Sequence, residues 1–287
     1  MLINQINLII HILTDNETTQ ENINKIIKIK KNYGNNLVEI KIYNLGERLK
    51  GIPTGKFPLS VTYRILLPSS LPNVNKIIYS DVDVLNLKDL TEMYNINLKE
   101  KIYFAGTLDH FSSIREIRQF GNHYDKYINS GILLMNLKAM REDSIEQKLI
   151  DFISNHNLTY CDQDTINVVC NNNIQVLSYK YAIKAFRTFE SFVSYNNHQN
   201  EKYRFNESEL KEAYNDTTFY HYAGFNKPWH HNYFKSNRKY WWYYAKISGF
   251  YQEILDYYKF NINDIDNLLR TIPQEGGVLK RNYKKFF

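Results

Sequence analysis

Cysteine and long apolar runs are both scarce in this sequence. Cys161 and Cys170 are the only cysteines among 287 residues. Two are too few for a disulfide framework, and no partner cluster of ligands points to zinc. We interpret both as free thiols in or beside a helix, in a reducing compartment. No apolar run approaches the ~20 residues that cross a bilayer, and the first residues lack a basic segment and a cleavage site, so we expect a cytoplasmic protein.

Positive charge is concentrated near the end of the chain. The net charge of +6 comes from residues 227–287, which hold eleven Lys or Arg, five Asp or Glu and all three tryptophans. Aromatic side chains beside cations suit an anionic membrane surface, and Leu279–Phe287 is the stretch that we expect to contact it. The alternative is an aromatic helix packed on the core with a solvated basic end, and the pattern leaves both open. No RNA- or DNA-binding fingerprint appears, so nucleic acid is not an expected partner.

Strand-like and helix-like segments alternate along most of the chain. Apolar runs predict strands at 7–13, 38–43, 77–80, 103–106 and 132–135. The predicted helices follow a capping box at Thr18–Glu21, cover residues 60–67 before Pro68, and bury a face formed by Ile145, Leu149 and Ile153. Residues 179–218 show no clear period, and we interpret them as loop-rich. The alternation predicts an α/β fold with a largely parallel, doubly wound sheet and ligands at its strand ends.

The predicted strand at 77–80 ends on two carboxylates, Asp81 and Asp83, separated by Val82. In an extended chain, residues two apart lie on one face, so both acids point the same way. Two oxygen ligands at the end of a strand suit Mg²⁺ or Mn²⁺ with open positions for a diphosphate. Taken alone, the pair also fits an acidic turn that enters a helix.

A second segment adds complementary chemistry. His221 offers a ring nitrogen, Gly224 allows close approach of the backbone, and Lys227 brings a cation within six residues. Together with Asp81 and Asp83 they could enclose a metal-bound diphosphate, in which the Gly224 N–H and the Lys227 ammonium counter the phosphate charge. A structural histidine among tyrosines is the alternative for His221.

The order and spacing of these motifs resemble glycosyltransferase family 8, in particular the retaining bacterial lipopolysaccharide α-galactosyl- and α-glucosyltransferases. The resemblance runs from about Ile6 to Trp229, through Thr62-Tyr63-Arg64, Asp81-Val82-Asp83, Asp109, Asn129-Ser130-Gly131, Asp162-Gln163-Asp164 and His221 to Trp229. It implies a GT-A fold, with a largely parallel mixed sheet flanked by helices, in a catalytic domain of residues 1–229. Residues 230–287 would form a small basic, aromatic helical segment.

The resemblance also implies the ligands and the roles of the site residues. It implies a UDP-sugar donor, a glycan or lipid-linked oligosaccharide acceptor, and Mn²⁺, with Mg²⁺ as the alternative ion, held by Asp81, Asp83 and His221. The donor-binding set is implied to comprise Arg64, Asp81, Asp83, Asn129, Asp162, Gln163, His221, Gly224 and Lys227. Asp109 is implied to bind the acceptor, and we expect residues 179–218 to lie near the acceptor site.

Asp162 and Gln163 are the implied catalytic pair beside the reacting carbon. Because a carboxamide is a weak nucleophile, we favour front-side attack by the acceptor hydroxyl, assisted by a donor phosphate oxygen, over double displacement. Outside the resemblance, each polar residue has an ordinary alternative. Arg64 suits a helix ion pair, Asp109 a turn, Asn129 the start of a tight turn, and Asp162 a helix N-cap.

One departure from the family concerns its first strand. Family members begin with an extra apolar strand and an Asp-containing loop that helps hold the uridine, whereas the predicted strand at 7–13 corresponds to their second strand. We expect either a shortened reading frame or a donor site that lacks part of its nucleoside pocket. This departure makes a non-catalytic or impaired sugar-nucleotide-binding protein one rival function. A metal-dependent nucleotidyltransferase or phosphohydrolase, which could also use Asp81 and Asp83, is a second rival. The second would need further clustered carboxylates, which the sequence does not show.

Overall fold

The computed structural model describes residues 8–32, 38–110, 113–121, 123–186, 188–233, 235 and 237–272. The predicted start of the first strand, Asn7, lies outside the described residues. The predicted membrane contact of Leu279–Phe287 also lies outside them.

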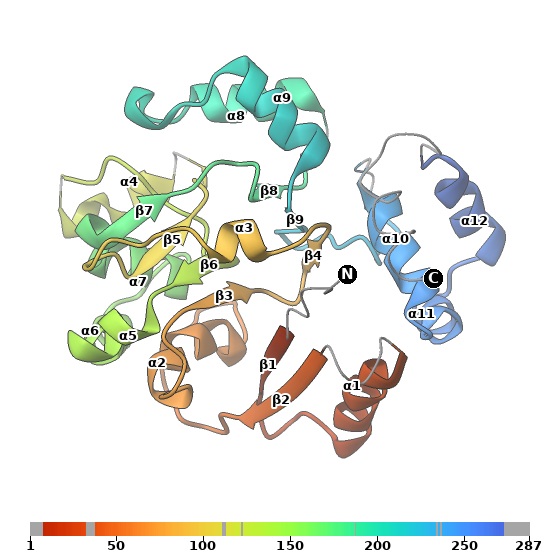
Figure 1. Cartoon of the computed structure of the whole chain (residues 1–287), viewed down its shortest axis with the longest axis horizontal. Coiled ribbons are helices and arrows are strands. Elements are labelled where there is room, and N and C mark those ends of the chain that lie inside the picture. Colours follow the sequence, from red (N-terminus) through yellow and green to blue (C-terminus); the bar gives the residue numbers. More distant parts are fainter. Residues whose placement is uncertain are drawn as a thin grey trace, which may run out of the picture.

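Strands and helices alternate along the described chain (Figure 1). The strands are β1 (Leu8–Thr14), β2 (Val38–Asn44), β3 (Ile77–Ser80), β4 (Val84–Asn86), β5 (Phe104–Gly106), β6 (Ile132–Met135), β7 (Ile174–Val176), β8 (Ala182–Lys184) and β9 (Phe219–His221). The α-helices are α1 (Gln20–Asn32), α2 (Leu67–Ser70), α3 (Thr91–Tyr94), α4 (Ser113–Ile117), α5 (Leu137–Glu142), α6 (Ile145–Asn155), α7 (Cys161–Val169), α8 (Phe189–Asn197), α9 (Glu207–Asp216), α10 (Arg238–Ile247), α11 (Tyr251–Tyr258) and α12 (Ile262–Arg270). The short 3₁₀ helices are η1 (Leu59–Leu66), η2 (Arg118–Phe120), η3 (Asn171–Asn173) and η4 (Glu201–Tyr203).

The strands form three sheets of mixed direction. The central sheet has the order β3-β6-β5-β7, a second has β4-β9-β8, and β1 pairs with β2. The β1–β2, β5–β7 and β8–β9 pairs are parallel, whereas β6 runs antiparallel to both of its neighbours and β4 to β9. The mixed α/β class is therefore confirmed, with more antiparallel pairing than the alternation predicts. The connection from β5 to β6 returns to the same end of the sheet, so these neighbours run in opposite directions.

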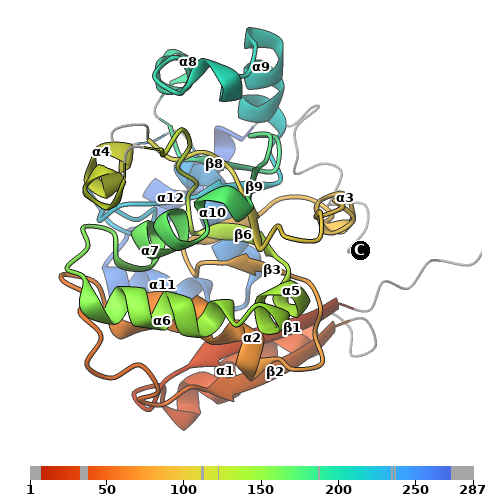
Figure 2. The same ribbon diagram turned by 90° about the vertical axis from the view of Figure 1, so that its left-hand side faces the viewer.

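The apolar core lies on both faces of the central sheet. Along β6, Leu133 and Met135 pack in one cluster with buried residues of α5, α6 and α7, and Ile132 and Leu134 pack in another with Phe219 of β9. This alternation follows from the two-residue period of a strand. Figures 1 and 2 show α8 and α9 at one end of the molecule and β1, β2 and α1 at the other.

Most of the predicted elements are present. The strands match, and Ile145, Leu149 and Ile153 of α6 are buried as predicted. The predicted end at Pro68 is wrong, because η1 passes into α2 and Pro68 occupies its first turn, where the missing N–H costs nothing. The predicted capping residue is displaced, since Thr19 Oγ1, rather than Thr18, accepts a hydrogen bond from the backbone N–H three residues on, that of Asn22.

Residues 179–218 are not loop-rich, which corrects the sequence interpretation. They contain β8, α8, η4 and α9. Each α-helix begins with reciprocal capping bonds, between Thr188 and Ser191 in α8 and between Asn206 and Glu209 in α9. The helices bury aromatic side chains such as Phe192 against the second sheet. Clustered aromatic residues obscured the helical period here.

Several aromatic residues after Trp229 pack inward, although Tyr257 is 78% exposed. Trp242 is fully buried in a small cluster with Leu255 and Ile265, and its Nε1 donates to Pro228 O at 3.0 Å. Tyr240 stacks on Tyr220 of β9. The packed-helix interpretation therefore holds for α10, α11 and α12. Among the described residues, no helix is long and apolar enough to cross a membrane.

Both cysteines lie at the ends of α7, as predicted. Cys161 opens the helix and Cys170 caps it, and both are buried free thiols. Burial raises the pKa of each thiol to about 12, so neither is a reactive thiolate near neutral pH.

Candidate functional site

Strand pairing brings the acidic pair next to His221. Asp81 and Asp83 follow β3 and precede β4, and β4 pairs with β9 so that Val84 lies opposite His221. The side chain of Val82 between them is fully exposed. His221 Nε2 lies 3.3 Å from Asp83 Oδ1 and 3.9 Å from Asp81 Oδ2. We call these three side chains the acidic corner.

The acidic corner has the composition of a divalent cation site. One ligand atom from each of its three residues lies within 4.8 Å of the others. Two carboxylates and one imidazole suit Mn²⁺ or Mg²⁺, and three protein ligands leave positions free for water or phosphate oxygens. The donor set therefore fits the ion that the sequence predicted.

Lys227 lies on the outer side of the acidic corner. Its Nζ donates to Asp83 Oδ2 and, at 3.0 Å, to Tyr222 O. Burial disfavours the charged form of Asp83, but its contacts with His221 and Lys227 outweigh this effect and lower the pKa of Asp83 to about 2. The carboxylate is therefore ionised across the physiological pH range.

Gly224 allows the backbone conformation of the loop that carries Lys227. Its φ is +102°, which disfavours any residue with a side chain, while a Cβ there would meet no atom within 4 Å among the described residues. The requirement for glycine therefore comes from the turn. The loop is tied to α10, because Arg238 Nε donates to Pro228 O at 2.9 Å.

Arg64 connects the acidic corner to Asp162. Buried on η1, it donates through Nη2 to Asp81 Oδ1 at 2.7 Å and through Nη1 to Ser130 O, and its Nε lies 3.1 Å from Asp162 Oδ2. These contacts lie within the protein, and its contact with sugar hydroxyls stays a prediction. The ion-pair alternative holds for this residue.

Asp162 lies in the first turn of α7 but does not cap it, because Tyr160 occupies the N-cap position. Burial raises its pKa to about 6, against the opposing effect of the Arg64 charge, and the nearby Asp81 carboxylate adds to the rise. Asp162 Oδ2 is buried and, apart from its ion pair with Arg64 Nε, has no hydrogen-bond partner among the described residues. That oxygen has acceptor capacity for a hydroxyl group.

A second group of buried polar side chains lies beside the acidic corner, and we call it the amide network. Its members are Asp109, Asn129, Gln163, Lys184 and Tyr195. Asp109 Oδ2 accepts from Asn129 Nδ2 at 2.8 Å and from Gln163 Nε2 at 3.1 Å. Asp109 Oδ1 accepts from Lys184 Nζ, Tyr195 OH and the His110 N–H. These donors, Lys184 foremost, overcome the burial of Asp109 and hold its pKa well below its usual range.

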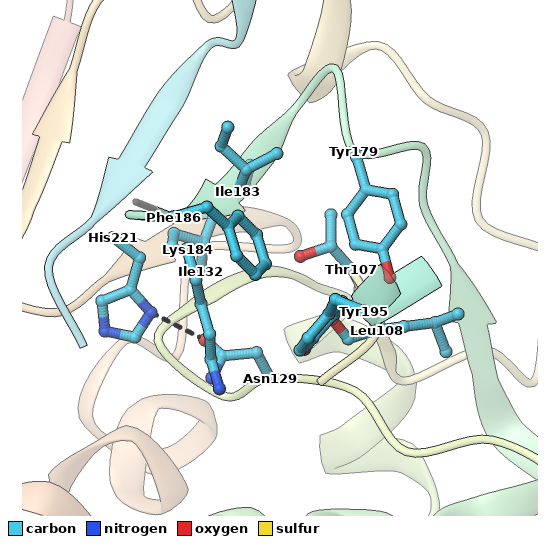
Figure 3. Close-up of a pocket in the computed structure, with 11 residues that line it drawn as sticks. Thr107, Leu108, Asn129, Ile132, Tyr179, Ile183, Lys184, Phe186, Tyr195 and His221 are labelled. Carbon is cyan, nitrogen blue, oxygen red and sulfur yellow. Dashed lines mark hydrogen bonds between the residues drawn. The ribbon is translucent and has the colours of Figure 1, made fainter. Parts of the chain in front are cut away.

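Figure 3 shows how the two groups meet, with a hydrogen bond from His221 to Asn129 and Lys184 alongside. These residues and the rings of Tyr179, Phe186 and Tyr195 line a cavity of about 10 Å³. That is the space of a single water molecule, so the cavity is no substrate pocket.

The structure thus brings most of the predicted site residues into two adjoining groups, with Arg64, Asp162 and Lys227 at their edges and Gly224 in the loop. Sequence reasoning missed Lys184 and Tyr195, because they reach Asp109 from β8 and α8, more than 70 positions along the chain. It also missed Tyr79, whose OH donates to Asp81 Oδ1 at 2.7 Å. A tyrosine two residues before an acid, on a predicted strand, was the available signal.

The family whose model matches this chain is glycosyl transferase family 8, over residues 1–233. A lipopolysaccharide 1,2-glucosyltransferase of Escherichia coli is 27% identical over 256 residues, covering 86% of this chain and 67% of the relative. A lipopolysaccharide 1,3-galactosyltransferase of Salmonella typhimurium is 23% identical over 234 residues, covering 78% of this chain and 64% of the relative. The chain spans 41 to 67% of the length of three curated relatives that it matches.

Solved structures give the same fold. The galactosyltransferase LgtC, in complex with donor and acceptor sugar analogs, superposes with a TM-score of 0.63 at 17% identity, covering 84% of this chain and 95% of LgtC. The bifunctional glycosyltransferase WbbM superposes with a TM-score of 0.68 at 14% identity, covering 89% of this chain and 52% of WbbM. The fold is therefore of the GT-A type, and the chain belongs to glycosyltransferase family 8.

Proposed function

We propose that this chain is a metal-dependent, retaining glycosyltransferase that moves a hexose from a UDP-sugar to a lipopolysaccharide, lipooligosaccharide or other glycan acceptor. The observation that carries the proposal is the convergence of Asp81, Asp83 and His221, with Lys227 beside them, in a chain of family 8. The names of the two lipopolysaccharide relatives, a glucosyl- and a galactosyltransferase, support a hexose as the transferred group.

The acidic corner is proposed to hold Mn²⁺, or Mg²⁺ in its place. A cation held there offsets the negative charge that grows on the departing UDP as the glycosidic bond breaks. Lys227 contributes a second positive charge on the same side, and its ammonium can turn from Asp83 toward a diphosphate because its side chain is 21% exposed. Gly224 gives the loop the conformation that places this lysine.

Asp162 is proposed to fix the donor sugar. Its buried Oδ2 pairs with Arg64 Nε at 3.1 Å and accepts no hydrogen bond from the described residues, so its remaining acceptor capacity could serve a sugar hydroxyl. A buried acceptor that gains a hydroxyl partner only when the sugar is bound favours the correct ligand over an analogue that lacks the hydroxyl.

The surroundings of Gln163 support front-side attack. Its Oε1 accepts from Asn129 Nδ2 and from the Ser130 N–H, both at 3.0 Å. Two donors withdraw electron density from an oxygen that is already a weak nucleophile, so a covalent adduct on Gln163 is disfavoured. In the proposed reaction the acceptor hydroxyl attacks from the face that UDP leaves, and its proton passes to a donor phosphate oxygen.

Asp109 remains the proposed acceptor-side residue, and its contacts show how it would act. Both of its oxygens are engaged inside the protein, whereas the side chain of its partner Lys184 is 29% exposed. We therefore propose that the acceptor meets the network through Lys184. Asp109 would then orient this lysine instead of binding the acceptor directly.

A panel of UDP-sugars tests the proposal. Purified protein should release UDP from UDP-glucose or UDP-galactose only when Mn²⁺ or Mg²⁺ is present, and faster when a lipooligosaccharide acceptor is added. A retaining reaction on an α-linked donor should give an α-linked product, seen as a small anomeric coupling in the NMR spectrum. No release with any donor would instead support a sugar-nucleotide-binding protein, and a β-linked product would exclude the retaining mechanism.

A further inference from the structure

The carboxamide of Asn129 has only one orientation that satisfies its surroundings. Its oxygen accepts from the Gly131 N–H at 3.0 Å and contacts His221 Nδ1 at 2.9 Å. Its nitrogen donates to Asp109 Oδ2 and to Gln163 Oε1. A flipped amide would place two N–H groups against the Gly131 N–H and an oxygen against the Asp109 carboxylate. The backbone donor therefore fixes which atom of Asn129 faces the histidine.

This orientation determines the tautomer of His221. Because Asn129 presents an oxygen, Nδ1 of His221 must carry the proton and donate it. The lone pair of the neutral ring then lies on Nε2, the atom that faces Asp83 Oδ1 at 3.3 Å and Asp81 Oδ2 at 3.9 Å. A hydrogen-bonded Nδ1–H that leaves Nε2 free is the arrangement in which imidazole ligates a metal.

Gly131 leaves the space in which the ring of His221 lies. A Cβ at this position would come within 2.3 Å of His221 Cε1 and 2.9 Å of Asp81 Oδ2. Contacts that short cannot be made, so a side chain at position 131 would displace the ring or the carboxylate. The carbonyl of Gly131 also accepts from the Asp81 N–H at 2.8 Å. The same residue thus touches both halves of the acidic corner.

Asn129 has no hydrogen-bonding capacity left for a sugar. Its oxygen has two partners, both hydrogens of its nitrogen are used, and the residue is 7% exposed. The sequence resemblance implied a donor-sugar contact for this residue, which stays a prediction. Its contacts within the protein connect the amide network to the acidic corner.

We infer that Asn129 and Gly131 are positioning residues for the metal site: Asn129 sets the tautomer of His221, and Gly131 provides the space for its ring. The inference rests on the proposed metal dependence and deepens it, since it names what orients the nitrogen ligand. Ser130, between them, serves as a matched control. Its hydroxyl is directed at Gln163 and Asp162 and touches neither His221 nor Asp81, and an alanine there keeps the backbone contacts to Arg64 and Gln163.

The test measures Mn²⁺ affinity without any nucleotide, from the electron paramagnetic resonance signal of the free ion. Asn129→Ala should bind Mn²⁺ about 10- to 100-fold more weakly than wild type, the usual loss when the partner of a metal-bound histidine is removed. Gly131→Ala should lose at least as much, whereas Ser130→Ala should keep the wild-type affinity. Thermal unfolding of each variant shows that it is folded. Unchanged Mn²⁺ affinity in Asn129→Ala and Gly131→Ala, with a raised donor KM alone, would overturn the inference in favour of sugar contact.

A second measurement keeps the inference testable if a variant fails to fold. In ¹⁵N-histidine-labelled wild-type protein with Mg²⁺ added, the His221 resonances, assigned from their loss in His221→Gln, should show a protonated Nδ1 and an unprotonated Nε2. The opposite tautomer would overturn the inference. If wild type binds no divalent ion, the proposed metal dependence fails, but the proton on Nδ1, measured in the absence of metal at a pH where the ring is neutral, still decides the role of Asn129.

Discussion

The acidic corner and the amide network lie side by side but differ in how their charges are satisfied. In the corner, two carboxylates and an imidazole nitrogen converge, while the cations Arg64 and Lys227 contact the other oxygen of each carboxylate. In the network, Asp109 accepts from five donors within the protein. Converging ligands with open positions can take up a cation, while a saturated carboxylate can only hold its neighbours in place.

Similar residues therefore have different functions in the acidic corner and in the amide network. Asp83 and Asp109 are both ionised and both contact a lysine, yet only Asp83 faces other potential metal ligands. Substitutions in the corner should therefore affect turnover more than folding, and substitutions in the network should affect folding first. The next predictions test this contrast, from the largest expected effect to the smallest.

Removing a ligand from the acidic corner should have the largest effect. Asp83→Asn or Asp81→Asn removes a charged ligand with almost no change in volume, so UDP release with Mn²⁺ should fall by about 10²- to 10³-fold, and the melting temperature should change little. Asp125→Asn is a matched control, since Asp125 pairs with Lys202 away from the corner. Wild-type turnover in both corner variants would remove the metal assignment.

Removing the centre of the amide network should destabilise the fold. Asp109→Ala leaves Lys184 and several buried donors without their acceptor, which should lower the free energy of unfolding by about 3–5 kcal/mol in urea titrations. Asp83→Ala, in the more exposed acidic corner, should lower the free energy of unfolding by less. Because the pKa of Asp109 is lowered in the folded state, its contribution is present above the usual Asp range and is lost as the pH falls through the folded pKa. Equal stability of Asp109→Ala and wild type would show that the network is not structural.

Substituting Lys227 should separate metal binding from diphosphate binding. Lys227→Met should lower kcat/KM for the UDP-sugar by about 10- to 100-fold, since a hydrogen bond to a charged group contributes about 1.5–3 kcal/mol. Mn²⁺ affinity in the absence of nucleotide should not fall, because the substitution removes a positive charge from Asp83. Isothermal titration with Mn²⁺ and then with UDP separates the two effects. Weaker Mn²⁺ binding by this variant would contradict the assigned role.

Asp162 should have the smallest effect on turnover, and this effect should appear in the pH dependence of kcat/KM. Its pKa of about 6 means that the carboxylate form increases as the pH rises through that value. If the carboxylate accepts a donor hydroxyl, kcat/KM should fall below pH 6 by up to about tenfold per pH unit. Asp162→Asn should have a lower kcat/KM than wild type, and its kcat/KM should not fall further below pH 6. A pH profile that is identical in the variant and the wild type would assign the step to another group.

Local patterns in the sequence predicted the parts of the fold that depend on local chemistry. The apolar run Ile132–Met135 forms β6, and the spacing of Ile145, Leu149 and Ile153 gives the buried face of α6. The direction of β6 was not predictable in this way, because it depends on where the chain returns after β5. The helix α9 could have been found, since Asn206 and Glu209 have the spacing of a capping box.

In the candidate site too, the sequence predicted some features and not those that depend on distant contacts. Asp81, Asp83 and His221 were predicted as one group because their side chains share a chemistry, and the pairing of β4 with β9 brings them together. The fixed amide of Asn129 could not be foreseen, since it depends on donors from Gly131 and acceptors more than 15 positions away. Sequence indicates which residues can hold a ligand, whereas the contacts that hold those residues require the structure.

The most direct test of the account is the detection of a histidine nitrogen bound to Mn²⁺. Electron spin-echo envelope modulation on Mn²⁺-loaded wild-type protein should show ¹⁴N modulation from one imidazole, and His221→Gln should lose it. Asp83→Asn should lose most of the bound Mn²⁺. Modulation that persists in His221→Gln, or Mn²⁺ bound with no nitrogen ligand in wild type, would contradict the claim that Asp81, Asp83 and His221 together hold the ion.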